Sequence, residues 1–158
     1  MKLTESRWVH VIWCDDIRQE VGNKSSLMGV YSNGLVVPSL PTMLPRLAAW
    51  IHVHTPTAQP FETLNLRINR SDSDEPVASI QITEMPPAPP LPDSQNMAGK
   101  AMTMGFVLLL GPLVLNETTN WFKVFVETES EILESFKLSI RTTATDVALA
   151  ASAGLQAY

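Results

Sequence analysis

Apolar and polar residues alternate with a period of two along much of this chain, which constrains it to fold through β-strands. The strictest alternation occurs in residues 63–69 and 135–141. Successive side chains of a strand point to opposite faces, so one residue in two would face a core. We expect six side chains from these segments to lie between two sheets: Leu64, Leu66, Ile68, Phe136, Leu138 and Ile140.

Turn signals divide the chain into eight or nine short strands. Trp8–Cys14 is apolar on both faces, which favours a central strand or one covered by a partner. Asn33 and Gly34 both tolerate positive φ and predict a hairpin between strands at 25–31 and 35–37. Further strands are expected at 47–55, 63–69, 77–83, 120–128 and 132–142, and residues 106–110 and 113–115 are apolar and are interrupted by Gly111 and Pro112.

Three segments lack a strand pattern and are interpreted as connections. Residues 15–23 form a polar connection, and residues 70–76 form a solvated loop. Residues 86–104 form a proline-rich irregular crossing, because Pro86–Pro92 contains five prolines and cannot pair centrally in a sheet. We interpret the proline run as a stiff spacer in preference to a ligand for aromatic grooves, since it has no adjacent basic anchor.

The alanine-rich tail, residues 143–158, differs in composition from the rest. Thr145 and Gly154 bracket good helix formers and predict a helix of about two turns, which is too short to be stable alone. We therefore expect residues 146–158 to pack on the chain's own sheets or on a neighbouring chain. The expected fold is all-β: a single-domain antiparallel β-sandwich of about eight strands over residues 1–142, followed by this short helix or extended tail. A closed barrel is the alternative.

Charge and cysteine usage exclude several classes of function. Eleven basic and sixteen acidic side chains give a net charge of −5, without a Lys/Arg cluster, so we expect no nucleic-acid partner and no membrane surface. Cys14 is the only cysteine, which indicates a buried thiol and a reducing compartment. No signal peptide or long apolar stretch is evident. The expected location is the cytoplasm, or a larger particle built after cytoplasmic synthesis.

The densest polar cluster beside the core contains Asp15, Asp16, Arg18 and Glu20. Carboxylate oxygens are ligands for Mg²⁺ or Ca²⁺, so a metal site is one interpretation. Adjacent residues of an extended chain point opposite ways, however, and turn carboxylates commonly accept backbone N–H groups. We favour the structural interpretation, in which this pair of aspartates shapes the first connection and does no chemistry.

Three histidines raise the question of zinc. His52 and His54 share one strand face with Trp50, and His10 could join them if its strand lies alongside. The alternative is a set of interfacial residues, which we favour. Three tryptophans could likewise form a sugar platform, although tryptophan is common in cores and interfaces: Trp8, Trp50 and Trp121.

Four glutamates crowd one predicted hairpin, and paired carboxylates can serve a glycosidase. A solvated edge that blocks aggregation is the simpler interpretation. The residues are Glu127, Glu129, Glu131 and Glu134. Nucleophile-elbow, Cys-x-x-Cys, phosphate-loop and dinucleotide motifs are absent from the sequence, so we assign no catalytic, cofactor or metal residue and expect no cofactor.

A Cys-Asp-Asp-Ile-Arg motif at residues 14–18 carries a resemblance to a known family, with looser similarity across residues 8–142. The matching residues are Cys14, Asp15, Asp16, Ile17, Arg18, Gln19, Glu20, Lys24, Ser26, Leu27, Gly29, Val30, Tyr31, Pro41, Leu44, Pro45, Pro60, Phe61, Arg67, Gly111, Pro112, Phe136, Lys137 and Leu138. The chain resembles an uncharacterised family of small bacterial and phage-associated proteins, a domain of unknown function. The resemblance implies a β-sandwich of unassigned activity and brings no catalytic residue set.

Two hypotheses for function follow from these patterns. The first is a non-enzymatic protein that acts through contacts with a protein partner or with itself, as a structural or accessory component of a larger phage or mobile-element assembly. Apolar strands with few charges and the absence of a chemical motif favour it. The second is a metal-dependent enzyme or small-ligand-binding module that uses Asp15, Asp16 and the histidines.

Overall fold

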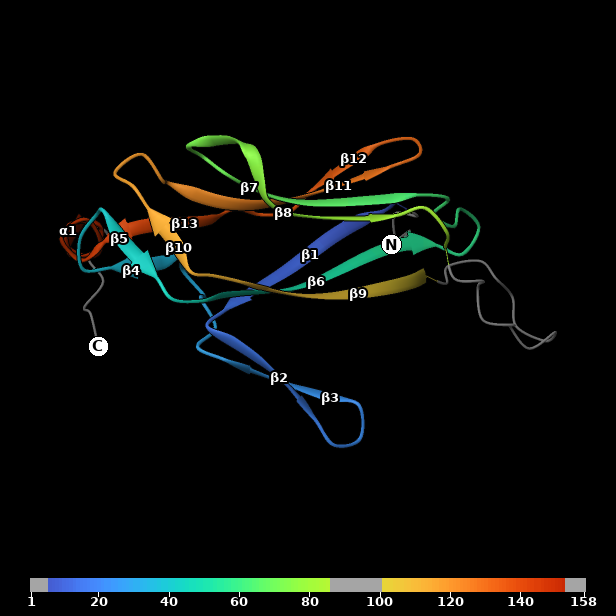
Figure 1. Cartoon of the computed structure of the whole chain (residues 1–158), viewed down its shortest axis with the longest axis horizontal. Helices are drawn as coiled ribbons and strands as arrows, with labels where there is room; N and C mark the ends of the chain where they lie inside the picture. Colours follow the sequence, from blue (N-terminus) through green and yellow to red (C-terminus); the bar gives the residue numbers. More distant parts are fainter. Residues whose placement is uncertain (1–5, 86–100, 153–158) are drawn as a thin grey trace.

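The computed structural model describes residues 6–85 and 101–152, and over these ranges the expectation of a mostly β chain is confirmed (Figure 1). The elements are β1 (Trp8–Cys14), β2 (Asp16–Glu20), β3 (Lys24–Met28), β4 (Leu35–Val37), β5 (Thr42–Leu44), β6 (Leu47–Pro56), β7 (Leu64–Arg70), β8 (Ser73–Ile82), β9 (Ala101–Leu110), β10 (Leu113–Leu115), β11 (Trp121–Thr128), β12 (Ile132–Glu134), β13 (Leu138–Thr142) and α1 (Thr143–Ser152).

The strands of the described residues form two larger and two smaller sheets, none of them closed. The three-stranded sheet has the order β1-β6-β9, and the six-stranded sheet has the order β4-β13-β11-β7-β8, with β12 also paired to β11. The small sheets are β10-β5 and β2-β3. All pairs are antiparallel except β13 with β4, which is parallel.

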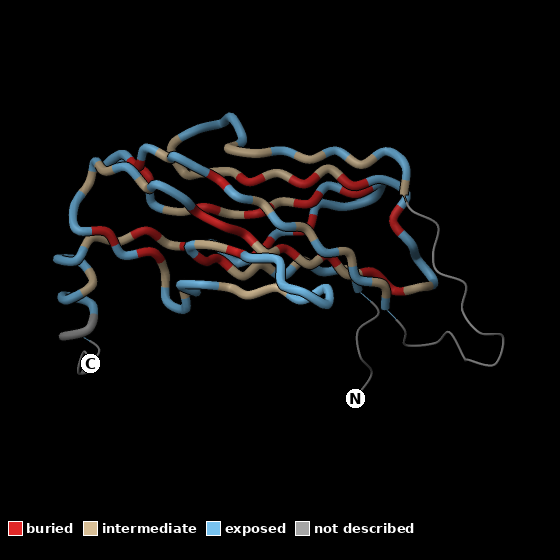
Figure 2. The backbone as a smooth tube through the Cα atoms, turned by 60° about the horizontal axis from the view of Figure 1, so that its bottom comes forward, coloured by how far each residue is buried: buried red, intermediate tan, exposed pale blue. Residues whose placement is uncertain are grey.

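The core lies between the two larger sheets, which form separate layers in Figure 1 and enclose the buried positions in Figure 2. Strand β6 supplies Ile51 and Val53, and β7 supplies Leu66 and Ile68. Each of these residues alternates with a more exposed neighbour, as the period of two requires. Five of the six side chains predicted for the core are buried: Leu64, Leu66, Ile68, Leu138 and Ile140.

Phe136 is the exception, and its predicted place in the core is wrong. Its exposed fraction is 94%, and it lies between the end of β12 and the start of β13. Ser135 takes the inner position instead: its N–H donates to Val124 O at 3.0 Å, and its hydroxyl accepts from Val124 N at 3.0 Å. The Ser135 hydroxyl thereby replaces a backbone group as the hydrogen-bond partner of Val124. This interrupts the regular strand pairing, and the Phe136 side chain turns outward.

The N-terminal third differs from prediction in two places. Residues 15–23 were expected to connect strands, but they contain β2, which pairs with β3 across a turn at Gly22 and Asn23. The hairpin predicted at Asn33 and Gly34 is also wrong. Strand β4 forms as expected, but it pairs in parallel with β13. Gly34 has φ of +110°, and a Cβ there would lie 2.7 Å from Ser139 O.

Strand β1 is an edge strand, so a central position for Trp8–Cys14 is excluded within the described structure. The solvated loop predicted at 70–76 is largely strand, since β7 ends at Arg70 and β8 begins at Ser73. Residues 101–104, expected to be irregular, begin β9. The proline run at 86–92 lies outside the described residues.

The predicted C-terminal helix forms, but two residues earlier than expected. Thr142 caps α1, and Arg141 pairs with Asp146 at 2.7 Å. Val147 and Leu149 remain exposed, so these side chains do not dock on the chain's own sheets as one version of the prediction required. Residues 153–158 lie outside the described part. No helix of the described residues is long and apolar enough to cross a membrane.

Candidate interaction surface

The outer face of the three-stranded sheet brings together most of the aromatic and histidine residues singled out in the sequence. The register pairs Trp8 with His54, His10 with His52, and Ile12 with Trp50. On the other side of β6, the same rows continue into β9. We call this surface the histidine face and define it as Trp8, His10, Ile12, Trp50, His52, His54, Thr103, Gly105, Val107 and Leu109.

Ring contacts order the histidine face. The Trp8 ring stacks on His54 with centroids 3.5 Å apart and planes 15° apart. Trp50 meets His52 edge-on at 4.6 Å, and the His52 and His54 centroids lie 6.2 Å apart. His54 Nδ1 also shares a hydrogen bond of 2.7 Å with Thr103 Oγ1. The strand that contains His10 thus lies beside the strand that contains His52 and His54.

The electrostatics of the histidine face favour an uncharged imidazole at His54. Burial lowers the pKa of His54 below its ordinary value of 6.5, and repulsion by His52 and His10 lowers that pKa further. At neutral pH His54 is thus neutral. With Val107 and Leu109 exposed on the same face, the sheet presents a largely apolar and aromatic surface.

Neither the zinc site nor the sugar platform forms in the described residues. No group of three or more His, Cys, Asp or Glu residues there could hold a metal ion. The His54 ring is already engaged by Trp8 and Thr103. Trp121 lies on β11 in the other larger sheet, so the three tryptophans do not converge.

The two adjacent aspartates point to different partners, as expected for neighbours in an extended chain. Asp15 accepts a hydrogen bond from the Tyr31 hydroxyl. Asp16 accepts from Arg46 at 2.9 Å and pairs with Arg18 at 3.6 Å. Burial opposes ionisation of Asp16, but the contacts with Arg46 outweigh it and lower the pKa of this carboxyl. These contacts can hold the start of the β2-β3 hairpin in shape. Within the described residues, they bring no second carboxylate beside the oxygens of Asp15 or Asp16.

Glycine is required beside Asp15. Gly29 has φ of +66°, and a Cβ there would lie 2.0 Å from Asp15 Oδ2.

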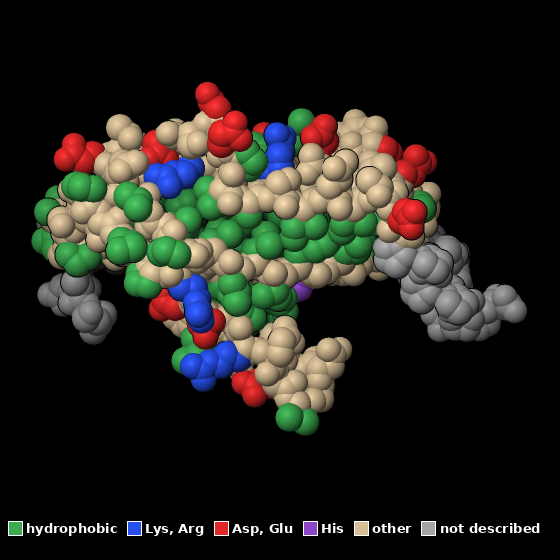
Figure 3. Space-filling view, in the orientation of Figure 1, with side chains coloured by type: hydrophobic (Ala, Val, Ile, Leu, Met, Phe, Trp, Pro, Cys, Tyr) green, Lys and Arg blue, Asp and Glu red, His purple; other side chains and the backbone are tan. Residues whose placement is uncertain are grey.

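The β2-β3 hairpin that precedes Gly29 projects from the sheet (Figure 3). Its base packs through Ile17 against Cys14 and Ala48 in a small second core. Burial raises the pKa of the Cys14 thiol, with Asp15 adding to the effect. Glu20, also singled out in the sequence, is exposed at the end of β2.

Two of the four glutamates singled out at the β11-β12 hairpin form separate ion pairs. Glu129 pairs with Arg7 at 2.5 Å, and Glu134 pairs with Lys123. Burial acts against ionisation of Glu129, but backbone N–H groups, including that of Glu62, and the Arg7 guanidinium lower its pKa to about 2. Glu129 and Glu134 are therefore each engaged by a cation, which favours a structural role for these two carboxylates.

Arg7 is the most connected polar residue of the described chain, and sequence reasoning missed it. Its guanidinium donates to Thr55 Oγ1 at 3.2 Å and to Thr128 Oγ1 at 3.3 Å. It also reaches the carbonyls of Gln59 and Pro60 at 3.2 and 3.1 Å. The side chain is only 6% exposed. A single arginine before a strand carries no sequence signal of such a role, because its partners are 48 to 123 residues away.

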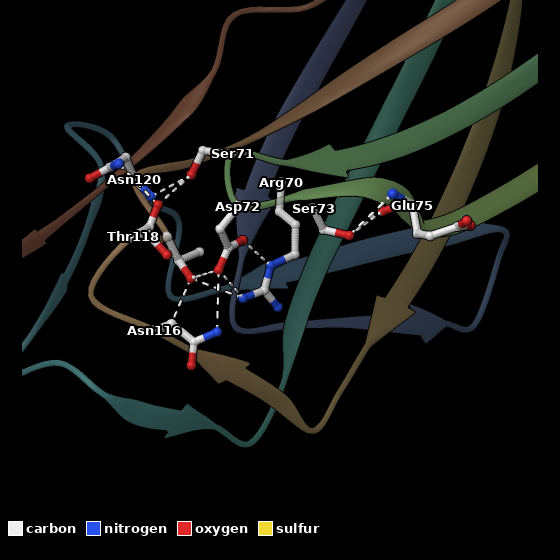
Figure 4. Close-up of polar contacts among 9 residues, drawn as sticks. Arg70, Ser71, Asp72, Ser73, Glu75, Asn116, Thr118 and Asn120 are labelled. Atoms are coloured by element: carbon white, nitrogen blue, oxygen red, sulfur yellow. Dashed lines mark hydrogen bonds and ion pairs between the residues drawn. The ribbon is translucent and has the colours of Figure 1, made fainter.

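A second buried polar network lies where β7 turns into β8 (Figure 4). Asp72 accepts from Arg70 Nη2 at 2.7 Å, from Thr119 Oγ1 at 2.6 Å and from Asn116 Nδ2 at 3.4 Å. The hydrogen bond from Arg70 outweighs burial and holds the pKa of Asp72 well below its usual range. All these groups satisfy one another, so the network ties two loops together and offers no open site.

Comparison with known proteins places the chain at the level of a family. No curated protein and no solved structure matches it. Residues 10–141 match the model of a family of unknown function, DUF6941. The match covers most of the chain and runs from β1 to β13. This agrees with the expectation of a domain of unknown function over most of the chain. The chain therefore belongs to this family of unknown function.

Proposed function

We propose that this protein is a non-enzymatic β-sandwich that acts through protein contacts, as a structural or accessory component of a larger assembly of the phage or mobile-element type. Its partner is another protein or a second copy of the chain, and neither nucleic acid nor membrane is involved. It works in the cytoplasm or within a particle assembled there.

The histidine face is the observation that carries this proposal. It is a sheet surface with Trp8, Val107 and Leu109 exposed and with an imidazole whose pKa favours the neutral form. Contiguous apolar and aromatic surface of this kind is typical of protein interfaces. One stacked and one edge-on ring pair also order the face, so its side chains need little reorganisation to bind.

The experiment is a quantitative capture of cross-linked partners from the native host, comparing two lysine variants. Val107→Lys places a charge on the histidine face, whereas Val114→Lys places one on β10, outside that face, at a similarly exposed valine. The proposal expects loss of a captured species with the first variant alone. Equal capture by both variants would reject the histidine face as the contact surface.

The alternative is a metal-dependent enzyme or ligand-binding module built on Asp15, Asp16 and the histidines. The histidines share one face of the sheet, which is the observation in its favour. Metal analysis of the purified protein separates the two. Stoichiometric zinc, manganese or calcium that disappears in Asp16→Asn or His52→Ala would favour the alternative.

A further inference from the structure

One edge of strand β1 is covered by no other described strand and is free at Val9 and Val11. Among the described strands β1 pairs only with β6. Tyr31 N–H donates to Trp13 O at 2.9 Å, so Trp13 turns its backbone groups away from β6. Hydrogen-bonding direction alternates along an antiparallel strand, so Val9 and Val11 turn their N–H and C=O groups to the same side. No described residue pairs with these groups there.

A cavity runs along this free edge. It has a volume of about 630 Å³, and its lining includes Val9 and Val11 on one side and Leu133 on the other. A second cavity of about 260 Å³ shares Val11 and Phe136 with the first. We call the two together the edge groove. Successive residues of β1 line it, which places it along the strand edge and not on one face of the sheet.

Two exposed apolar side chains border the edge groove. Phe136 is 94% exposed and Ile132 is 55% exposed, and both line the larger cavity. The polar hydroxyl of Ser135 occupies the inner position that alternation predicts for Phe136. A phenylalanine held almost wholly in water beside a cavity and an unpaired strand edge is a ready contact for an apolar side chain of a partner.

A buried donor without a partner lies at one end of the groove. Trp13 is only 5% exposed, and its indole Nε1 has no hydrogen-bond partner among the described residues. Trp13 also lines the smaller cavity. Buried indole N–H groups normally find an acceptor, so this end of the groove suits a ligand oxygen.

The charges of the groove select against a basic occupant. Arg7 is neutralised by Glu129, and Glu134 is paired with Lys123. Lys137, which lines the smaller cavity, forms no ion pair within the described part of the chain. The groove therefore complements a segment that is neutral or acidic.

We infer that the edge groove binds an extended segment of a partner protein, which adds to β1 as a further strand. Backbone groups of Val9 and Val11 would supply its hydrogen bonds, as in other cases of strand addition. Its side chains would be apolar at alternate positions, since those facing inward meet the half-buried Val9 and Val11. This inference rests on the proposed function, because it names the kind of partner that a protein-contact module would take.

A single strand fits this groove better than a second copy of the chain. The groove is lined by β1 on one side and by β12 with Phe136 on the other. An extended peptide enters such a channel alone, whereas the edge strand of a second copy brings its whole sheet with it. Light scattering tests this choice: a wild-type dimer that Phe136→Ala converts to monomer would identify the occupant as a second copy and overturn the inference.

The direct test selects binders from a library of random 12-residue peptides displayed on phage, with the full chain as bait. Selected peptides are then synthesised with a fluorophore and titrated by fluorescence anisotropy. Phe136→Ala should weaken binding at least tenfold, whereas Val21→Ala, at a valine 97% exposed on the β2-β3 turn, should not change it. Hydrogen exchange should slow at the amides of Val9 and Val11 on peptide binding.

A second variant probes the backbone contact. Val11→Pro removes one outward N–H, which an edge strand tolerates, and should also weaken binding at least tenfold. Val11→Thr keeps the N–H and the branched shape and serves as its control. Failure to select any peptide, or peptides that bind Phe136→Ala as tightly as wild type, would overturn the inference. Loss of capture by Val107→Lys would still support the proposed function in that case, so the two failures are distinguishable.

Discussion

Arg7 and Glu129 form an ion pair with Nη2 and Oε1 2.5 Å apart, which joins the residue before β1 to the turn after β11. The same guanidinium lies over the Phe61 ring, 4.7 Å from its centroid. The pair therefore links both larger sheets and the loop between β6 and β7 at one end of the core. Its removal should affect the whole fold and not only the N-terminus.

Arg7→Ala should lower the free energy of unfolding by about 2–4 kcal/mol, because it leaves the Glu129 carboxylate and the buried Thr55 and Thr128 hydroxyls without their donor. Arg7→Lys should lose less, since it keeps the charge but not the planar set of donors. Urea titration measures both. A loss below about 0.5 kcal/mol in Arg7→Ala, the range of ordinary surface changes, would contradict this account.

Glu129 should make stability fall in acid. Its pKa in the folded protein is about 2, against an ordinary value of 4.5, so the unfolded chain takes up a proton first as the pH falls. The stabilisation is complete above about pH 4.5 and is lost between there and pH 2. Melting curves should show Glu129→Gln below wild type at pH 7, with the difference closing towards pH 2. A constant difference would refute the assignment.

The exposure of Phe136 gives a sharp contrast with its neighbour. Phe136→Ala should change the free energy of unfolding by less than about 0.5 kcal/mol, as for other exposed sites. Leu138→Ala, two residues later and buried, should cost about 2–5 kcal/mol. Denaturant titration of the two variants under one set of conditions measures both changes. Equal losses in the free energy of unfolding would indicate that Phe136 packs in the core.

His54 should couple the histidine face to pH. Its folded pKa lies below 6.5, so the unfolded chain binds the proton more readily, and stability falls as the pH drops from about 6.5 through the folded pKa. His54→Phe keeps a ring against Trp8 and removes the titration. The melting temperature should therefore fall less between pH 8 and pH 5 in this variant than in wild type. An identical fall in both would contradict the prediction.

Asp72→Asn should cost about 2–3 kcal/mol, because one carboxylate oxygen facing Arg70 and Thr119 becomes an amide donor. Asp74→Asn is the matched control: the same change two residues later, at an exposed position of β8, should stay within about 0.5 kcal/mol. Thermal melts of the two variants provide the comparison, and similar melting temperatures would show that the network contributes little.

The local alternation of apolar and polar residues predicted the strands that bury one face in the core. Strand β7 follows the expected pattern because each inner residue is apolar and each outer residue polar, so only one register buries the right set. The same logic failed at Phe136. The Ser135 hydroxyl accepts a hydrogen bond from a backbone N–H of β11. A pattern of apolar and polar residues cannot predict such a hydrogen bond.

Partners distant in the sequence account for what prediction missed. Nothing near Leu35–Val37 indicates that β4 pairs with a strand more than a hundred residues later, and turn chemistry at Asn33 and Gly34 pointed to a local hairpin. For the candidate site, the shared face of His52 and His54 followed from their spacing. The edge groove did not, since it needs the meeting of β1 with β12.

The parallel pairing of β4 with β13 has a consequence for biosynthesis. Residues 35–37 cannot complete their sheet until residues 140–142 have been synthesised, so most of the chain leaves the ribosome before this contact can close. Contacts of such long sequence separation slow folding and leave strand edges and apolar faces open for longer. Until residues 140–142 emerge, β4 is without its sheet partner, a state that favours aggregation of the nascent chain.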